Sequence, residues 1–439
     1  MRGFVIAALC AVLYALYMRS GTNGIPAHML HHKLTATPDI MDRATQQELL
    51  ALLKQWGDAN ATAGGFATND QDAKATKPTH EHVGEGVPLA VGGSCAHRLM
   101  VPSVDRSQCT LPQRLDVAKH FLTYGGTAAL KERYAKSIGR LLSFGRYIFN
   151  PQDFPVIQRL FDSETFLAAA RGVCPAAAQH LDPFQFNFIV QLPGQSVATH
   201  IDGVYFWGAS RFHVPQWLLA AMKFSGLYEE RFVDQVQVVA YFHEWDAPRA
   251  GADSSAGDFA YYASGDRAPR TVKPAPRSGN CVDGSKTVHA ATVYERGGRE
   301  PPRLQKSQSN KLVYLGGERW ELRSDGVRNG APYTTDDLRL SLVFRARCFK
   351  DAPTAAKFNE QLRDPSAQLS LDGILERLSV HVGRKPGEAA AMSRLELALD
   401  IVSKAVRYPL PNVLVPWNVC MLDKALPAAE PIVRFFCGE

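Results

Sequence analysis

The residues best suited to chemistry are two histidines and one aspartate. The run His200-Ile201-Asp202 follows a Pro193-Gly194 turn, and His289 lies far downstream. Residues two apart on a strand share a face, so His200 and Asp202 can reach one metal ion. Two imidazoles and one carboxylate form the facial triad that holds Fe(II) and leaves positions open for other ligands. This set predicts an iron oxygenase.

A second histidine-x-aspartate pattern shows how common such triplets are. His180-Leu181-Asp182 stands directly before Pro183 and ahead of the first expected strand. A proline in that place favours a turn that enters the core. We therefore expect the metal at His200 and Asp202, with His180 and Asp182 as the rival pair.

The elements that position these residues are predominantly short strands. Apolar and β-branched runs separated by Gly- and Pro-rich turns predict strands at 184–191, 233–243, 258–262, 287–294, 311–315 and 338–349. Helical spacing predicts helices within 39–56, 111–171 and the region after 351. Many strands without alternating helices favour an antiparallel barrel. The predicted fold is α+β with a mainly β core, a double-stranded β-helix or jelly roll, and flanking helices.

The chain divides into segments of different composition. The expected division is an N-terminal signal segment at 1–20, a helix with a flexible stalk at 21–110, helical support at 111–180, a jelly-roll core at 181–350 and a helical extension at 351–439. The stalk is placed at 57–94, where Ala, Gly, Thr and Asp dominate. An exposed insertion at 295–332 interrupts the core.

Charge and the N-terminus bear on location. The net charge of +6 over 439 residues, without a run of basic residues, predicts no nucleic-acid partner. Arg2 and Arg19 flank an apolar run at 4–17 that lacks a small-residue cleavage site. We expect a single-pass signal anchor, with membrane contact through residues 4–17 and the chain in the endoplasmic reticulum or Golgi lumen. Secretion after cleavage and a short buried helix are the alternatives.

Eight cysteines are compatible with an oxidising compartment. Proximity in the sequence suggests pairing Cys95 with Cys109 and Cys420 with Cys437, although sequence alone cannot fix connectivity.

The chain resembles the Fe(II)- and 2-oxoglutarate-dependent dioxygenases, in particular the prolyl 4-hydroxylase-like branch, over roughly 184–350. The matching features are the Pro193-Gly194 turn before the triad, the strand start Gly257-Asp258-Phe259, Gly284 ahead of His289, and Arg339-Leu340-Ser341. Two features depart from the family pattern. Gln191 stands where a tyrosine is common, and Arg339 lies much farther from the second histidine than the family's basic residue does.

The resemblance implies roles for these residues. His200, Asp202 and His289 would bind Fe(II) and form the catalytic centre, with O2 at the open position. Arg339, with Ser341, would bind the distal carboxylate of 2-oxoglutarate, since a guanidinium grips a carboxylate with two bonds. Arg345 is the rival for that role. Strand parity places Asn187 near the cosubstrate, and Gln191 belongs to the same site. Ascorbate is an optional reductant.

The resemblance also implies a substrate class. A secretory location favours hydroxylation of a protein or peptide, prolyl residues included. Three alternatives stay open: a non-catalytic jelly-roll binding protein, an oxygenase similar to the alkylated-base demethylases, which share the spacing of Arg339 and Arg345, and a cupin-like metal enzyme without 2-oxoglutarate. The loop after the triad could line a substrate entrance or pack in the core. Its residues in question are Tyr205, Phe206, Trp207, Arg211, His213 and Trp217.

Overall fold

The structure is a computed structural model. It describes residues 23–68, 87–88, 95, 97–103, 107–112, 115–123, 134–245, 255–305, 307–411, 413 and 415–437. The apolar run at 4–17, most of the expected stalk and Cys10 lie outside the described residues. Within the described ranges, no helix has the length and apolar character that crossing a membrane requires.

Two antiparallel sheets form the core. The large sheet has eleven strands. Ten follow one another as β1 (Leu34–Thr37), β12 (Gly279–Val282), β9 (Gln235–Tyr241), β18 (Arg339–Phe349), β7 (His180–Gln191), β6 (Phe144–Ile148), β2 (Phe66–Thr68), β14 (Asn310–Tyr314), β15 (Arg319–Ser324) and β16 (Val327–Arg328), and β17 (Tyr333–Thr334) pairs with β15.

The small sheet carries the histidines. Its order is β11 (Arg270–Val272), β10 (Phe259–Tyr261), β13 (His289–Ala291) and β8 (Val197–His200). Phe259 of this sheet packs with Val239, Tyr241 and Val343 of the large sheet, so the two sheets face each other. The fold is thus a jelly roll of two facing sheets with flanking helices, as predicted. A third, short sheet contains β3 (Val87–Pro88), β5 (Gln108–Thr110) and β4 (Val101–Pro102).

Strand β18 shows why this sequence forms the core. Its side chains alternate, so that Leu340, Leu342 and Phe344 face one side and are fully buried among apolar residues. Phe344 packs against Phe161 and Phe166 with ring centroids 5.4 and 5.2 Å apart. Burial of one such side chain stabilises the fold by roughly 1.5–3 kcal/mol. The other face of β18 therefore turns its arginines and Ser341 toward the small sheet.

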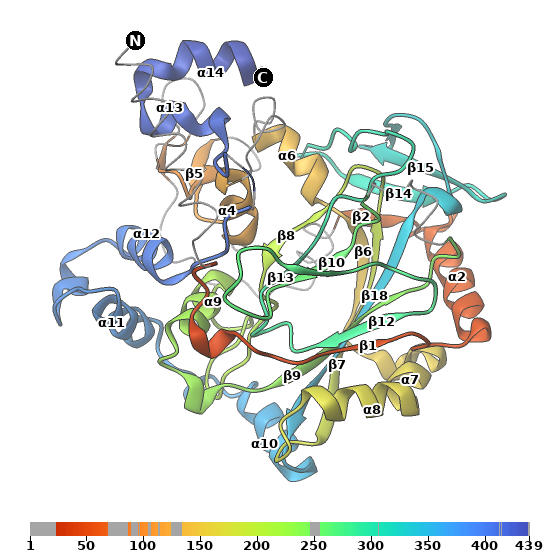
Figure 1. Ribbon diagram of the computed structural model, residues 1–439, viewed down its shortest axis with the longest axis horizontal. Helices are drawn as coiled ribbons and strands as arrows, with labels where there is room; N and C mark the ends of the chain where they lie inside the picture. The colour runs from red at the N-terminus through yellow and green to blue at the C-terminus, as the bar shows by residue number, and fades with distance from the viewer. Residues whose placement is uncertain are drawn as a thin grey trace.

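Helices cover the outer face of the large sheet. In Figure 1, α7 and α8 lie along one side of this sheet, and β8, β13 and β10 lie on its other side. The helices packed into this outer layer are α2 (Arg43–Gly57), α7 (Pro155–Asp162) and α8 (Glu164–Val173). Asp42 caps α2 by accepting a hydrogen bond from the Thr45 amide, which places the start of this helix after the expected residue 39.

A second apolar cluster supports the small sheet. It contains α9 (Gln216–Ser225), α11 (Leu371–His381) and α12 (Arg394–Ala405), together with Ile201 and Val288 beside the two histidines. The remaining α-helices of the described residues are α4 (Leu115–Thr123), α6 (Tyr134–Leu141), α10 (Ala352–Gln361), α13 (Leu422–Ala425) and α14 (Glu430–Cys437). The histidines therefore stand between two packed layers.

Two segments differ from their expected structure. Residues 66–68 fall in the expected stalk, but they form β2 between β6 and β14. The strand expected at 311–315 is β14, but the insertion 295–332, otherwise expected to be exposed, also contributes β15 to the large sheet. Its Leu312 and Trp320 are fully buried. In β15, Trp320 and Leu322 alternate with polar residues, a strand pattern that the Gly- and Arg-rich surroundings obscured.

The disulfides agree with the two expected pairs and add a third. Cys95 bonds to Cys109, and Cys420 bonds to Cys437. Cys174, which follows α8, bonds to Cys348 of β18. This bond was not predicted, because 174 residues separate the two cysteines and only the packing of α8 on the sheet brings them together. Cys281 is free and buried.

Candidate functional site

The three expected metal ligands come together between the sheets. Strands β8 and β13 are antiparallel and place His200 opposite His289, with ring centroids 4.3 Å apart. Asp202 follows β8, and its carboxylate lies 3.6 Å from His200 Nε2 and 3.4 Å from His289 Nε2. One ligand atom from each residue lies within 4.8 Å of the others. The grouping of these residues as a metal site is the one that the sequence predicts.

Hydrogen bonds to the backbone orient both imidazoles. His200 Nδ1 lies 2.7 Å from the carbonyl oxygen of Ala198, and His289 Nδ1 lies 2.8 Å from that of Thr287. Since a carbonyl oxygen only accepts, each Nδ1 carries the proton and each Nε2 presents a lone pair. This is the arrangement of metal-binding histidines, whose other nitrogen is fixed by a neighbouring acceptor. Both lone pairs are directed toward Asp202.

The Asp202 carboxylate is buried and ionised. Burial opposes its charge, but the Arg345 guanidinium beside it and the His289 and His200 rings hold its pKa well below the ordinary value. Arg345 Nη2 donates a hydrogen bond to Asp202 Oδ1. Asp202 Oδ2 is buried and accepts no hydrogen bond. A buried carboxylate oxygen without a donor is costly, so this atom fits a cation that would complete it.

The backbone approaches the triad closely at Gly284. The Asp202 amide donates to the Gly284 carbonyl oxygen at 2.8 Å. A methyl group at Gly284 would lie 2.2 Å from Asp202 Oδ2 and 2.2 Å from Gln237 Nε2. Gln237 Nε2 also lies 3.5 Å from His289 Nε2. Sequence reasoning missed Gln237, although a glutamine that interrupts the apolar run of β9 was a signal.

Arg339 forms the second part of the site. Its side chain is almost fully buried, and among the described residues Asp258 attracts its charge without forming an ion pair with it. Arg339 Nη1 donates to Gln191 Oε1 at 2.5 Å and to Ser341 Oγ at 3.4 Å. Burial lowers the pKa of the Arg339 guanidinium, and the nearby Tyr241 partly offsets this effect. A buried cation without an anion is unfavourable, so the arrangement favours a bound carboxylate.

Unsatisfied polar atoms mark where that carboxylate would lie. Arg339 Nε and Gln191 Nε2 are buried donors that form no hydrogen bond. The Tyr241 hydroxyl is also buried without a partner of good geometry, and the Tyr241 ring lies 5.0 Å from Arg339 Cζ. Unsatisfied N–H and O–H donors at and beside a guanidinium are the groups that bind carboxylate oxygens.

Strand β10 and the residues before it connect Arg339 to the triad. Gly257 has a φ of 75°, and a methyl group there would lie 2.6 Å from Arg339 Nε. Phe259 stacks on the His289 ring at a centroid distance of 5.5 Å. Residues two apart on an extended chain are separated by about 6–7 Å. Arg339 and His289 thus both contact the short segment Gly257–Phe259.

The other expected site residues take different places. Arg345 pairs with Asp202, so its role as rival to Arg339 in binding the cosubstrate is not supported. Asn187 is buried opposite Val343 and accepts a hydrogen bond from Gln185 at 3.0 Å. The rival pair His180 and Asp182 lies in β7, and Asp182 is 2.6 Å from Arg347. That pair extends a strand, where a turn was expected.

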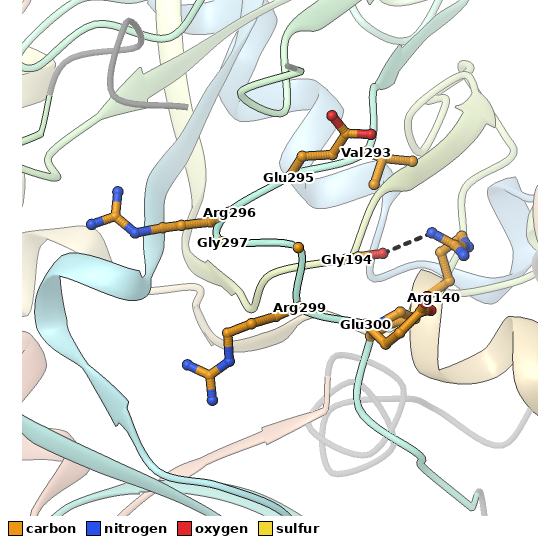
Figure 2. A pocket seen from close by; sticks show the side chains of 10 residues that line it. Arg140, Gly194, Val293, Glu295, Arg296, Gly297, Arg299 and Glu300 are labelled. Carbon is orange, nitrogen blue, oxygen red and sulfur yellow. Dashed lines mark hydrogen bonds between the residues drawn. The ribbon is translucent and has the colours of Figure 1, made fainter. Parts of the chain in front are cut away.

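A separate hollow of about 430 Å³ lies beyond the Pro-Gly turn. Figure 2 shows its lining residues, with Arg140 donating to the Gly194 carbonyl oxygen and Arg296 and Arg299 extending away from Gly194. Arg296 pairs with Asp336, and Arg299 lies 3.6 Å from Asp337. Since these arginines have acidic partners, the hollow does not form an anion site.

Comparison with known proteins gives structural neighbours only. The sequence matches no known family profile, and no curated protein matches it. Among solved structures, a prolyl-4-hydroxylase from Pseudomonas putida is 12% identical over 72% of this chain and 92% of that chain, with a TM-score of 0.32. HygX from Streptomyces hygroscopicus, with nickel and 2-oxoglutarate bound, is 9% identical over 76% of this chain and 85% of that chain, with a TM-score of 0.29.

A viral collagen prolyl hydroxylase from Paramecium bursaria Chlorella virus-1, in complex with 2-oxoglutarate, is 11% identical over 47% of this chain and 78% of that chain, with a TM-score of 0.25. The function therefore rests on the geometry of the site itself.

Proposed function

We propose that this protein is an Fe(II)- and 2-oxoglutarate-dependent oxygenase that hydroxylates a peptide or protein, with prolyl residues as the first candidates. The observation that carries the proposal is the pairing of two separate sites between the same two sheets. One site offers two Nε2 lone pairs and an unsatisfied carboxylate oxygen. The other offers a buried arginine that forms no ion pair with any described acid.

The residues of the two sites would have different roles. His200, Asp202 and His289 would hold Fe(II), and Arg345 would hold Asp202 in place by binding its Oδ1. Arg339, Ser341 and Gln191 would bind the distal carboxylate of 2-oxoglutarate. Iron with 2-oxoglutarate and O2 supplies the oxidising power to hydroxylate a C–H bond, while 2-oxoglutarate becomes succinate and CO2. The sheets hold these groups in line and keep water away.

We infer the lumenal location from the disulfides, and the peptide substrate from that location. Disulfides Cys95–Cys109, Cys174–Cys348 and Cys420–Cys437 fit an oxidising compartment. In such a compartment the common targets of a hydroxylase are other secreted chains. Membrane attachment through residues 4–17 stays a prediction.

The test is the visible charge-transfer band that Fe(II) and 2-oxoglutarate form together, recorded without oxygen on the full chain. Wild type should show the band, and Asp202→Ala should lose it. Arg339→Lys should keep iron but need about 10- to 100-fold more 2-oxoglutarate, since it loses charged hydrogen bonds worth about 1.5–3 kcal/mol. Arg319→Gln, an exposed site in β15, is the matched control.

A folded wild type that forms no band would contradict the proposal and favour a non-catalytic binding protein. A band that is indifferent to Arg339→Lys would favour a metal enzyme that does not use 2-oxoglutarate.

A further inference from the structure

The loop between β8 and α9 carries several aromatic and basic residues beside the triad, and the structure separates their roles. Phe206 and Trp217 are buried in the apolar cluster under the small sheet. Tyr205 is buried elsewhere, and Trp207 packs edge-on against Phe358 at 5.0 Å. These four residues are structural. The expectation that they line a substrate entrance is not supported.

Arg211 differs from its neighbours in this loop. Its side chain is half-buried, and none of the described residues forms a hydrogen bond or an ion pair with its guanidinium. Arg211 Cζ lies 5.4 Å from the Phe149 ring centroid and 5.5 Å from that of Phe212. Attraction between a guanidinium and aromatic rings does not use its N–H groups, so these donors stay available for a ligand.

Arg211 lies next to the metal ligands. Gly203 directly follows Asp202, and a methyl group at Gly203 would lie 3.7 Å from Arg211 Cδ. Gln235 Nε2 donates to the Gly203 carbonyl oxygen at 3.2 Å and fixes this backbone. The partner Phe149 directly follows strand β6 of the large sheet. Arg211 therefore reaches from the loop of the triad to the opposite sheet.

The loop holds Arg211 in a defined position. Ser210 is fully buried, and its hydroxyl accepts a hydrogen bond from the Phe212 amide at 3.3 Å. The Ser210 carbonyl oxygen accepts from the amides of His213 and Val214 at 2.9 and 3.1 Å. Ser210 Oγ also lies 3.0 Å from His213 Nδ1. His213 thus has a structural partner, and the arginine stands on a rigid turn.

The three arginines around the centre have different partners. Arg345 binds Asp202, and Arg339 is enclosed with Gln191 and Ser341. Arg211 alone of the three has no polar partner among the described residues, and like Arg345 it is partly exposed to solvent. A single guanidinium can form two hydrogen bonds with one carboxylate, whereas phosphate groups are bound by clusters of arginines.

We propose that Arg211 binds a carboxylate of the substrate, so that the substrate is a peptide with an aspartate or glutamate close to the residue that is hydroxylated. The inference rests on the function proposed above and specifies its substrate. Phe149 and Phe212 would flank the acidic side chain and exclude water from the ion pair, which strengthens it.

The test measures peptide preference on the full chain loaded with Ni(II) and 2-oxoglutarate, which permits binding without turnover. The probe is a library of peptides with a central proline and randomised flanking positions. Wild type should enrich aspartate and glutamate at one flanking position, with acidic peptides bound about 10-fold more tightly than their amide counterparts. Arg211→Gln should lose this preference, and Arg211→Glu should favour lysine or arginine. Arg319→Gln should behave as wild type.

Absence of acidic enrichment in wild type would overturn the inference, and so would an acidic preference that survives Arg211→Glu. The first result needs no variant, so it holds even if a variant misfolds. The charge-transfer band separates this failure from failure of the function. Arg211 contacts neither the triad side chains nor Arg339, so its variants should keep the band. A wild type with the band but without acidic preference would refute only the substrate inference.

Discussion

Gly284 provides a steric test of the metal centre that changes no ligand. Its conformation is ordinary, so Gly284→Ala introduces no backbone strain. The added methyl group would lie 2.2 Å from Asp202 Oδ2 and from Gln237 Nε2. Ordinary contact begins at 3.4 Å, so the carboxylate or the backbone must move by about 1 Å. Metal–ligand distances tolerate changes of only about 0.2 Å.

We therefore expect Gly284→Ala to weaken Fe(II) binding by at least about 10- to 100-fold, the effect of disturbing groups that orient metal ligands. Overpacking should also lower the free energy of unfolding by about 1–3 kcal/mol. The assay is titration of the charge-transfer band with Fe(II) at saturating 2-oxoglutarate, together with urea denaturation of the metal-free protein.

Gly265→Ala is the matched control, since a methyl group there meets no atom within 4 Å and the backbone is equally ordinary. The variant Gly265→Ala should bind iron as wild type does. If Gly284→Ala also binds iron with wild-type affinity, Asp202 does not supply Oδ2 to the metal and our reading of the site is wrong.

Two further predictions concern stability. Burial, reinforced by Arg339, lowers the pKa of His243 from 6.5 to about 3, so the unfolded chain takes up a proton between these values. The free energy of unfolding should fall by up to about 1.4 kcal/mol per pH unit below pH 6.5. Urea denaturation at pH 7, 5 and 4 measures this dependence, and His243→Phe should lack the part that is due to His243. The same pH dependence in wild type and His243→Phe would contradict the assignment. Replacing Cys174 and Cys348 together by alanine should lower the free energy of unfolding by about 2–5 kcal/mol, because the bond closes a long loop. A loss no larger than that of Cys281→Ala would contradict this.

The sequence by itself determined the ligand set and the fold class. Strand periodicity is local, so alternation along 338–349 and the Pro193-Gly194 turn indicated a β core before any contact was known. The same parity placed His200 and Asp202 on one face. Pairs of cysteines close in the sequence were also recoverable, because short loops leave few partners.

The tertiary structure decided which polar groups meet. Arg339 and Arg345 share a face of β18 and look equivalent in sequence, but their strand positions place one beside Gln191 and the other beside Asp202. The bond between Cys174 and Cys348 and the burial of Trp320 likewise depend on long-range packing. The sequence could not show that the N–H groups of Arg211 have no acceptor among the described residues. Whether a side chain has a partner depends on all the residues that pack around it in three dimensions.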